Sequence, residues 1–241
     1  MPCPNKASLA HIRHPLPVYL AIRGCIHYTH NMENPVMILG ATRLGRIALD
    51  IFLSRNIVTY CFLDDDKELH NTEVNEVAVM GSTTDDGFLK FIGKKCEAFI
   101  AVEDREHRIK LVERIKERRK VMPVNAIHDL AYISETAHLG YGNLVAAGAV
   151  INPNAKVPNH CVVDSRAVID CDAELEEFVQ VGAGAIIGAN CKVREGAFIG
   201  AGAVIAAGME IGKNAQVAPG AVVLQEVPEE GIVFGNPAKG A

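Results

Sequence analysis

The sequence predicts two domains: an α/β N-terminal domain of Rossmann-like type, followed by an all-β left-handed parallel β-helix made of hexapeptide repeats. From Pro35 onward, short β-rich runs alternate with helical stretches, which is typical of βαβ units. From Ile133 to Val223, every sixth residue is Ile, Leu or Val. Apolar residues make up 49% of the 241 residues and aromatic residues only 5%, so aliphatic side chains must fill the core.

The N-terminal domain is predicted over residues 33–128. Its predicted strands are Val36 to Leu39, Ile57 to Leu63, Val77 to Met80 and Ala98 to Val102. Helices from Arg43 to Ser54 and from Glu106 to Arg119 carry apolar side chains at helical spacing. The basic cluster of the second helix is interpreted as its solvated face. Residues 125–129 are interpreted as the linker to the second domain.

A ligand site is predicted at the carboxyl ends of these strands. Gly40, in the first turn, lets backbone amides approach a phosphate, and both the following helix N-terminus and Arg43 add positive charge. Asp64 and Asp65 end the second strand, where carboxylates would accept a ribose hydroxyl or a uracil N–H. An acidic surface turn is the alternative. The turn is not GxGxxG, which argues against a dinucleotide and a nicotinamide-dependent enzyme.

The second domain is predicted over residues 129–241, with sixteen repeats from residue 133 to residue 228. The first, third and fifth positions of each repeat are expected to point the same way along a short strand, and a turn follows. Three strands per coil would stack residues that are 18 apart. Cys161 and Cys191, at fifth positions, are expected in the core, whereas His138 and His160 are expected at surface corners.

Charge and cysteine usage limit the possible partners. The formal net charge of -5 makes nucleic acid and anionic membrane surfaces poor candidates. No apolar run approaches the ~20 residues that span a bilayer. The seven cysteines are dispersed, without CxxC or CxxH pairs, so we expect no zinc site and a reducing cytoplasm.

Residues 1–31, with four histidines, are interpreted as a disordered extension or an early start codon rather than a metal-binding or targeting tail.

Several segments together resemble a known family. The repeat is similar to that of hexapeptide-repeat acyltransferases, and the stretches ILGATRLGRIALDI, FLDDD, VAVMGS, AFIAVEDREHR, AIHDLAYISETAHLG and VFGNPAK look like the sialic-acid O-acetyltransferase and UDP-sugar N-acetyltransferase family. The resemblance covers residues 35–238. It implies a homotrimer that uses acetyl-CoA as acyl donor, bound in a groove between neighbouring prisms.

The resemblance also implies site residues. Thr42, Arg43, Asp64 and Asp65 would contact the nucleotide sugar. A set of three residues would line the acyl-CoA arm: Gln180, Ala201 and Pro219. Ordinary corner residues are the alternative interpretation of the small side chains in that set.

The catalytic position departs from the family. Where the family has V-D-H-D or I-E-H-E, this sequence has Ile169-Asp170-Cys171-Asp172, so Cys171 replaces the histidine base. A thiol with a pKa of about 8.5 is mostly protonated at neutral pH, and the acidic neighbours raise that pKa further. Cys171 could be a nucleophile, it could be inert while Asp172 or a neighbouring subunit's histidine acts as base, or catalysis could be weak or lost.

The sequence therefore predicts an N- or O-acyltransferase that acts on a sugar or a nucleotide-activated amino sugar, with an amino acceptor favoured because an amine tolerates the loss of a base better. The alternative is a catalytically impaired paralogue that binds a sugar nucleotide or acyl-CoA without turnover.

Overall fold

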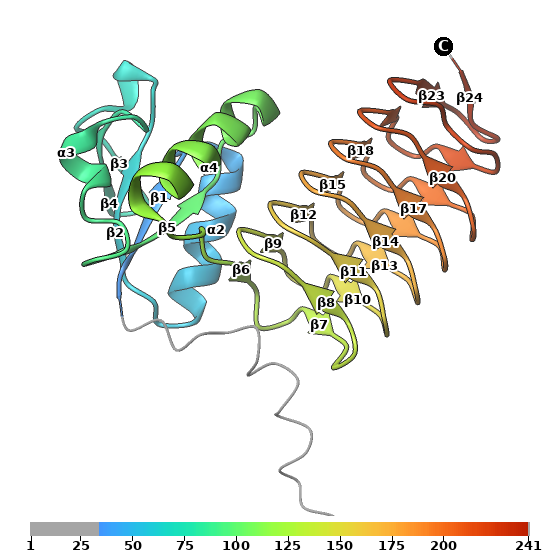
Figure 1. The fold of residues 1–241 in the computed structure, drawn as a ribbon, viewed down its shortest axis with the longest axis horizontal. Helices are drawn as coiled ribbons and strands as arrows, with labels where there is room; N and C mark the ends of the chain where they lie inside the picture. The colour runs from blue at the N-terminus through green and yellow to red at the C-terminus, as the bar shows by residue number, and fades with distance from the viewer. Residues whose placement is uncertain (1–33, 241) are drawn as a thin grey trace, which may run out of the picture.

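The computed structural model describes residues 34–240. An α/β unit lies at one end of the molecule, and a regular stack of coils runs away from it toward the C-terminus (Figure 1). The predicted extension over residues 1–31 lies outside the described residues.

The N-terminal unit is built on a five-stranded sheet with the order β3-β4-β2-β1-β5. Its strands are β1 (Val36–Leu39), β2 (Thr59–Leu63), β3 (Glu73–Val74), β4 (Val77–Gly81) and β5 (Glu97–Ile100). β1 pairs in parallel with β2 and β5, β2 pairs in parallel with β4, and β3 is antiparallel to β4. All four predicted strands are present, with ends shifted by at most two residues. β3 was not predicted, because two residues show no periodicity.

Two longer helices cover this sheet. α2 spans Arg43–Ser54, as predicted, and α4 spans Arg105–Arg119, one residue longer than predicted. The side chain of Asp104 caps α4 by accepting the backbone N–H of His107, and α4 ends at Lys120 in a left-handed conformation. The short helices α3 (Asp86–Leu89) and η2 (Lys67–Leu69) were not predicted.

The two faces of the sheet have separate apolar clusters, and each reaches into the β-helix. The cluster on the α2 side includes Leu144, Ala146 and Val162 of the β-helix. The cluster on the α4 side includes Phe178. The N-terminal unit is therefore packed against the first coils through apolar contacts.

The coils form three stacks of strands, as the hexapeptide period predicted, and the strands pair in parallel except for the terminal β24, which is antiparallel to β23. Sheet I comprises β7 (Tyr132–Ile133), β10 (Val150–Ile151), β13 (Val168–Ile169), β16 (Ile186–Ile187), β19 (Val204–Ile205) and β22 (Val222–Val223). Sheet II comprises β8 (His138–Leu139), β11 (Lys156–Val157), β14 (Glu174–Leu175), β17 (Lys192–Val193) and β20 (Glu210–Ile211). Sheet III comprises β6 (Ala126–Ile127), β9 (Leu144–Val145), β12 (Val162–Val163), β15 (Gln180–Val181), β18 (Phe198–Ile199), β21 (Gln216–Val217), β23 (Ile232–Phe234) and β24 (Lys239–Gly240).

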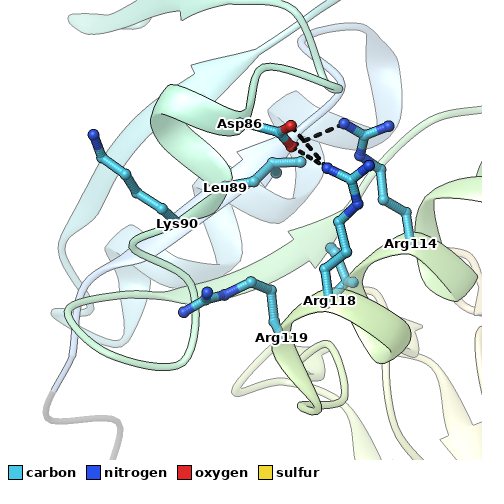
Figure 2. A pocket seen from close by; sticks show the side chains of 7 residues that line it. Asp86, Leu89, Lys90, Arg114, Arg118 and Arg119 are labelled. Atoms are coloured by element: carbon cyan, nitrogen blue, oxygen red, sulfur yellow. Dashed lines mark hydrogen bonds and ion pairs between the residues drawn. The ribbon is translucent and has the colours of Figure 1, made fainter.

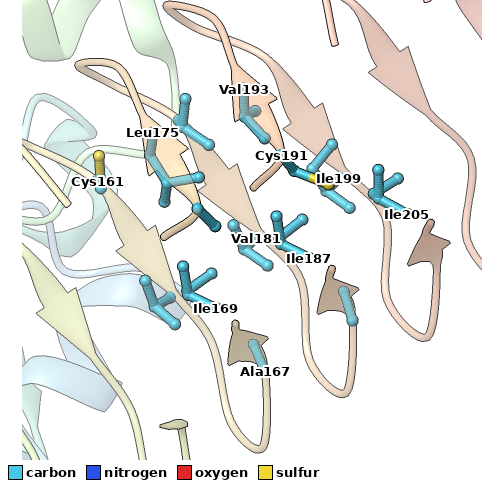
Figure 3. Packing of buried hydrophobic residues seen from close by; sticks show 14 of the residues in the cluster. Cys161, Ala167, Ile169, Leu175, Val181, Ile187, Cys191, Val193, Ile199 and Ile205 are labelled. Carbon is cyan, nitrogen blue, oxygen red and sulfur yellow. The ribbon is translucent and has the colours of Figure 1, made fainter. Parts of the chain in front are cut away.

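The register between coils is 18 residues, so like residues stack. Ile151, for example, pairs with both Ile133 and Ile169. The aliphatic first positions and the small fifth positions, including Cys161 and Cys191, point inward and form one continuous core (Figure 3). The third positions do not point inward, contrary to the prediction. Each strand is only two residues long, so the third position already lies at a corner.

The β-helix begins one strand earlier than predicted. Residues 125–129 were interpreted as a linker, but β6 at Ala126–Ile127 pairs in parallel with β9. Asn125 is also anchored, because its side chain donates to the carbonyl oxygen of Gly140 and accepts the N–H of Asn143. Ile127 of this strand lies six residues before Ile133, so the period of aliphatic residues already includes it.

The outward faces of the three sheets differ in chemistry. The outward ladder of sheet I is apolar and consists of Tyr132, Val150, Val168, Ile186, Val204 and Val222. Sheet II carries charges that pair along the stack, such as Lys156 with Glu174 at 2.6 Å. The first strands of sheet III are covered by the N-terminal unit. Sheet I is therefore the apolar face that the N-terminal unit leaves uncovered.

Candidate functional site

The first turn of the N-terminal unit is made of closely packed backbone. Gly40 has φ +111°, and a Cβ there would lie 2.7 Å from the carbonyl group of Ala101. A Cβ on Gly45 would lie 2.0 Å from the carbonyl oxygen of Gly40. Both positions require glycine, and the N-terminus of α2 is thereby held against the end of β1.

Asp64 shapes this turn. Its Oδ2 accepts the N–H of Ala41 at 2.7 Å, and its Oδ1 accepts the N–H of Asp66 at 2.9 Å. These two hydrogen bonds give Asp64 a structural role in the turn, which is compatible with the alternative of an acidic surface turn. Thr42 lies beside it, exposed at the start of α2, and its side chain makes no capping hydrogen bond.

Asp65 is held by polar groups from the segment after β4 and from α4. Its Oδ1 accepts hydrogen bonds from the hydroxyl of Ser82 and from the N–H and hydroxyl of Thr83, and its Oδ2 lies 3.2 Å from Nε2 of His107. Burial works to raise the pKa of Asp65, but the hydrogen bonds from Ser82 and Thr83 and the proximity of His107 outweigh it, so the pKa lies below its ordinary value. Asp65 is a carboxylate at neutral pH.

Arg43 joins the two parts of the chain. Its Nη1 donates to Oδ2 of Asp164 at 2.8 Å, and its Nε lies 3.5 Å from Oε1 of Glu103. Asp164 follows β12 in the β-helix and was not singled out from the sequence. A residue predicted to meet a phosphate is thus already paired with two carboxylates.

Cys171 lies at the corner between sheets I and II. Its backbone N–H donates to Oδ1 of Asp170 at 2.8 Å, and the same oxygen accepts Nδ2 of Asn152. Oδ1 of the neighbouring Asp172 accepts Nδ2 of Asn154 at 3.0 Å. The pKa of the Cys171 thiol is raised by partial burial and by the charges of Asp170 and Asp172. The thiol is therefore protonated at neutral pH, as the sequence predicted.

The residues predicted to line acyl-CoA lie elsewhere on the coil. Gln180 is in β15 of sheet III, and Ala201 and Pro219 stack at the corner between sheets III and I. At this corner a Cβ built on Gly184, Gly202 or Gly220 would meet no atom within 4 Å. We call these three stacked glycines the glycine ledge. A side chain at any of these three positions would therefore project into open space.

The single chain brings only some of the predicted residues together. Arg43, through Asp164, lies beside the corner between sheets III and I, which also carries Ala201 and Pro219. Cys171 and Asp172 lie across sheet I, at its other edge. The apolar ladder of sheet I separates the two groups.

A stacked cluster at the corner between sheets II and III was missed by sequence reasoning. Arg108 of α4 is only 2% exposed and lies 5.9 Å from the ring of Phe178, which stacks on His160 at 5.1 Å. The prediction that the basic residues of α4 face solvent is thus wrong for Arg108, and the prediction that His160 lies on the surface is wrong, since it is 4% exposed. Burial and the nearby charges of Arg108 and Lys116 lower the pKa of His160 to about 4.

A basic pocket lies between α3 and α4, away from the predicted residues (Figure 2). It has a volume of about 200 Å³ and is lined by Asp86, Leu89, Lys90, Arg114, Ile115, Arg118 and Arg119. Its arginines are largely engaged, because Arg114 and Arg118 both pair with Asp86 and Arg119 donates twice to the carbonyl oxygen of Ile92.

Within residues 34–240, no three His, Cys, Asp or Glu side chains are grouped as a metal site would require. Over the same range, no helix has the length and apolar character needed to cross a bilayer.

Comparisons with known proteins agree with this architecture. Residues 190–225 match the family model "Bacterial transferase hexapeptide (six repeats)". A search of curated proteins gave no match. Among solved structures, the acetyltransferase domain of PglB from Neisseria gonorrhoeae, in complex with acetyl coenzyme A, is 26% identical with a TM-score of 0.79, over 86% of this chain and 99% of that one.

Two further structures are similar over the same range. A variant of GDP-perosamine N-acetyl transferase from Caulobacter crescentus, in complex with CoA and GDP-perosamine, is 27% identical with a TM-score of 0.79, over 87% of this chain and 97% of that one. WeeI from Acinetobacter baumannii is 25% identical with a TM-score of 0.77, over 86% of this chain and 99% of that one. The resemblance to hexapeptide-repeat sugar acyltransferases, predicted from the sequence, is thereby confirmed.

Proposed function

We propose that this chain is an acyl-CoA-dependent acyltransferase that uses acetyl-CoA to acylate the amino group of a nucleotide-activated sugar. The observation that carries this proposal is the glycine ledge beside Ala201 and Pro219, next to the corner that Arg43 links to the N-terminal unit. The ledge would receive the acyl-CoA arm, and the Rossmann-like unit would receive the nucleotide. The structural relatives with bound acetyl-CoA, CoA and GDP-perosamine support both assignments.

The assembly we propose is a homotrimer of left-handed β-helices in contact through sheet I. Its outward ladder is apolar, with Tyr132 57% exposed and Ile186 41% exposed in the single chain. Covering such a ladder removes apolar surface from water. Because Cys171 and the glycine ledge flank sheet I on opposite edges, contact through this face would place the Cys171 corner of one copy near the ledge of the next. The transfer site would then be shared between copies.

In this site the acceptor amine attacks the thioester carbonyl, an N–C bond forms, the C–S bond breaks, and CoA leaves as its thiol. The proton lost by the amine needs an acceptor. Cys171 cannot serve, because its thiol keeps its own proton at neutral pH. We propose that Asp172 is the base. Among the described residues, only its Oδ1 accepts a side-chain hydrogen bond, from Asn154. Thr42, Asp64 and Asp65 would position the nucleotide, and Gln180 the acyl-CoA.

A non-catalytic protein that binds the same ligands is the second candidate, favoured by the replacement of histidine by Cys171. Incubation with acetyl-CoA and a panel of nucleotide-activated amino sugars separates the two. Mass spectrometry of the sugars and chromatography of CoA report transfer, and calorimetry reports binding. An acetylated sugar together with free CoA supports the enzyme, whereas binding of acetyl-CoA with no product supports the non-catalytic protein. Absence of both would contradict the proposed function.

The compartment we propose is the cytoplasm. The five cysteines of the described residues, Cys61, Cys96, Cys161, Cys171 and Cys191, are all free thiols. Free, dispersed thiols are typical of a reducing environment.

A further inference from the structure

One ladder of backbone positions at the corner between sheets III and I adopts a left-handed conformation in five successive coils. Four of the five positions are glycine: Gly148, Gly184, Gly202 and Gly220, with φ from 67° to 71°. The fifth is Arg166, with φ 59°. Arg166 is therefore the single side chain that interrupts this glycine ladder.

A left-handed conformation is unfavourable for a residue with a Cβ. Asparagine, which tolerates this conformation best, occurs at corners such as Asn154 and Asn190, but arginine gains nothing comparable. Within residues 34–240, the guanidinium of Arg166 makes no hydrogen bond and no ion pair, and the side chain is exposed. The left-handed backbone of Arg166 donates its N–H to the carbonyl oxygen of Ala147 at 3.1 Å, as a glycine there also could, but the side chain adds no polar contact to the fold.

The stem of Arg166 has a defined direction. Its Cγ lies 3.3 Å from the position that a Cβ on Gly148 would occupy. The side chain thus leans over the preceding coil, on the side of the N-terminal unit. Asp164, two residues earlier, is not paired with Arg166, and its two carboxylate oxygens accept Arg43 and the N–H of Ser165. Glu103 is likewise paired with Arg43.

We propose that Arg166 binds a phosphate group of a substrate, at the junction between the nucleotide-binding turn and the glycine ledge. A guanidinium offers several N–H donors in a planar fork that matches phosphate oxygens. This inference rests on the proposed function, in which both the nucleotide sugar and acyl-CoA carry a diphosphate. The phosphate ester is the group that the nucleotide sugar and acyl-CoA have in common. The experiment below determines which of these two ligands Arg166 binds.

The test is isothermal titration calorimetry of the full chain with CoA, GDP and UDP. Arg166→Gly restores the residue that the other four coils carry, so it should fold and be at least as stable as the wild type in urea. Loss of a charged hydrogen-bonding partner should weaken binding of CoA or of one nucleotide on the order of 10- to 100-fold. Arg166→Lys should retain part of the affinity, because it keeps the charge but loses the fork. Lys110→Ala, which removes an exposed charge from α4, should bind as the wild type does.

The ligand that loses affinity identifies the source of the phosphate. A change for CoA alone assigns Arg166 to the acyl donor, and a change for GDP or UDP alone assigns it to the acceptor. Unchanged affinities for all three ligands in Arg166→Gly would overturn the inference while leaving the proposed function in place. If Arg166→Gly dissociated the oligomer in sedimentation without changing affinity, Arg166 would be a contact between copies and the inference would be overturned as well. A wild type that binds none of the three ligands would contradict the proposed function itself.

Discussion

Acidification should weaken the docking of α4 on the β-helix through His160. His160 is buried against Phe178, and its pKa is about 4, below the ordinary value of 6.5. Burial is the main cause, and the charges of Arg108 and Lys116 add to it. The unfolded chain therefore binds a proton at a higher pH than the folded chain does. The stability due to the neutral imidazole is complete above pH 6.5 and is lost as the pH falls toward 4.

The magnitude follows from the two pKa values. The full difference corresponds to about 3 kcal/mol of unfolding free energy, since each pKa unit is 1.36 kcal/mol. Between pH 7 and pH 5, about 2 kcal/mol of this should already be lost. The carboxylates whose pKa values are lowered, such as Asp65 and Glu176, lose their contributions only below about pH 4.5, so pH 5 isolates the histidine.

The assay is urea unfolding at pH 7 and pH 5, at one protomer concentration because oligomers make stability concentration-dependent. His160→Phe is the matched variant, because Phe178 shows that an aromatic residue is accepted at φ 61° in the next coil, beside φ 60° for His160. His160→Asn is a second non-titrating variant that suits a left-handed conformation. The wild type should lose about 2 kcal/mol more than either variant between the two pH values. Equal losses of unfolding free energy in the wild type and both variants would contradict a lowered pKa of His160 as the cause.

Three further predictions concern the catalytic corner, the core and the outward face of sheet I. Cys171→His should raise turnover of the acetyl transfer by on the order of 10²-fold, since it supplies a base, while Cys171→Ala should leave the wild-type rate nearly unchanged in steady-state kinetics. Ile187→Ala should lower the unfolding free energy by about 2 to 5 kcal/mol in urea, because Ile187 is fully buried. Ile186→Asp should dissociate the oligomer in sedimentation, whereas Gln216→Asp on sheet III should not.

Each of these has a contrary outcome. An acetyl adduct on wild-type Cys171 in intact-mass spectrometry, together with loss of activity in Cys171→Ala, would make Cys171 a nucleophile. No gain in Cys171→His would count against the proposed position of the catalytic corner. A loss below 1 kcal/mol for Ile187→Ala would mean that the coils collapse around a cavity more readily than we expect. An Ile186→Asp protein with unchanged sedimentation would show that sheet I is not the contact face.

The repeating part of the fold could be predicted because its determinants are local and periodic. Each inward aliphatic, such as Ile151, Ile169 or Ile187, stacks on its equivalent 18 residues away, so one short pattern specifies the whole core. The strands and helices of the N-terminal unit were predicted for the same reason, within two residues at their ends. The missed elements β3, α3 and η2 are too short to show a period, whereas β6 was taken for a linker although its Ile127 lies six residues before Ile133.

The residues of the candidate site were proposed from the sequence, but their positions relative to one another were not. The identity of Cys171 and its acidic neighbours was enough to predict a protonated thiol. The sequence alone could not show that Cys171 and Ala201 lie at opposite edges of sheet I, because the third position of each repeat was expected to point inward. The prediction assumed that side chains alternate along a strand that includes the third position. The strands are only two residues long, so the chain has already turned at that position.

Contacts between residues that are far apart in the sequence were decided only by the tertiary structure. Arg43 reaches Asp164 across 121 positions of the chain, and Arg108 reaches Phe178 through the docking of α4 on the β-helix. Neither contact has a local signature, because each depends on how two independently specified units pack. The sequence by itself determined the two architectures and the chemistry of their residues. Packing between them determined which charges are paired, which histidine is buried, and which face is left uncovered.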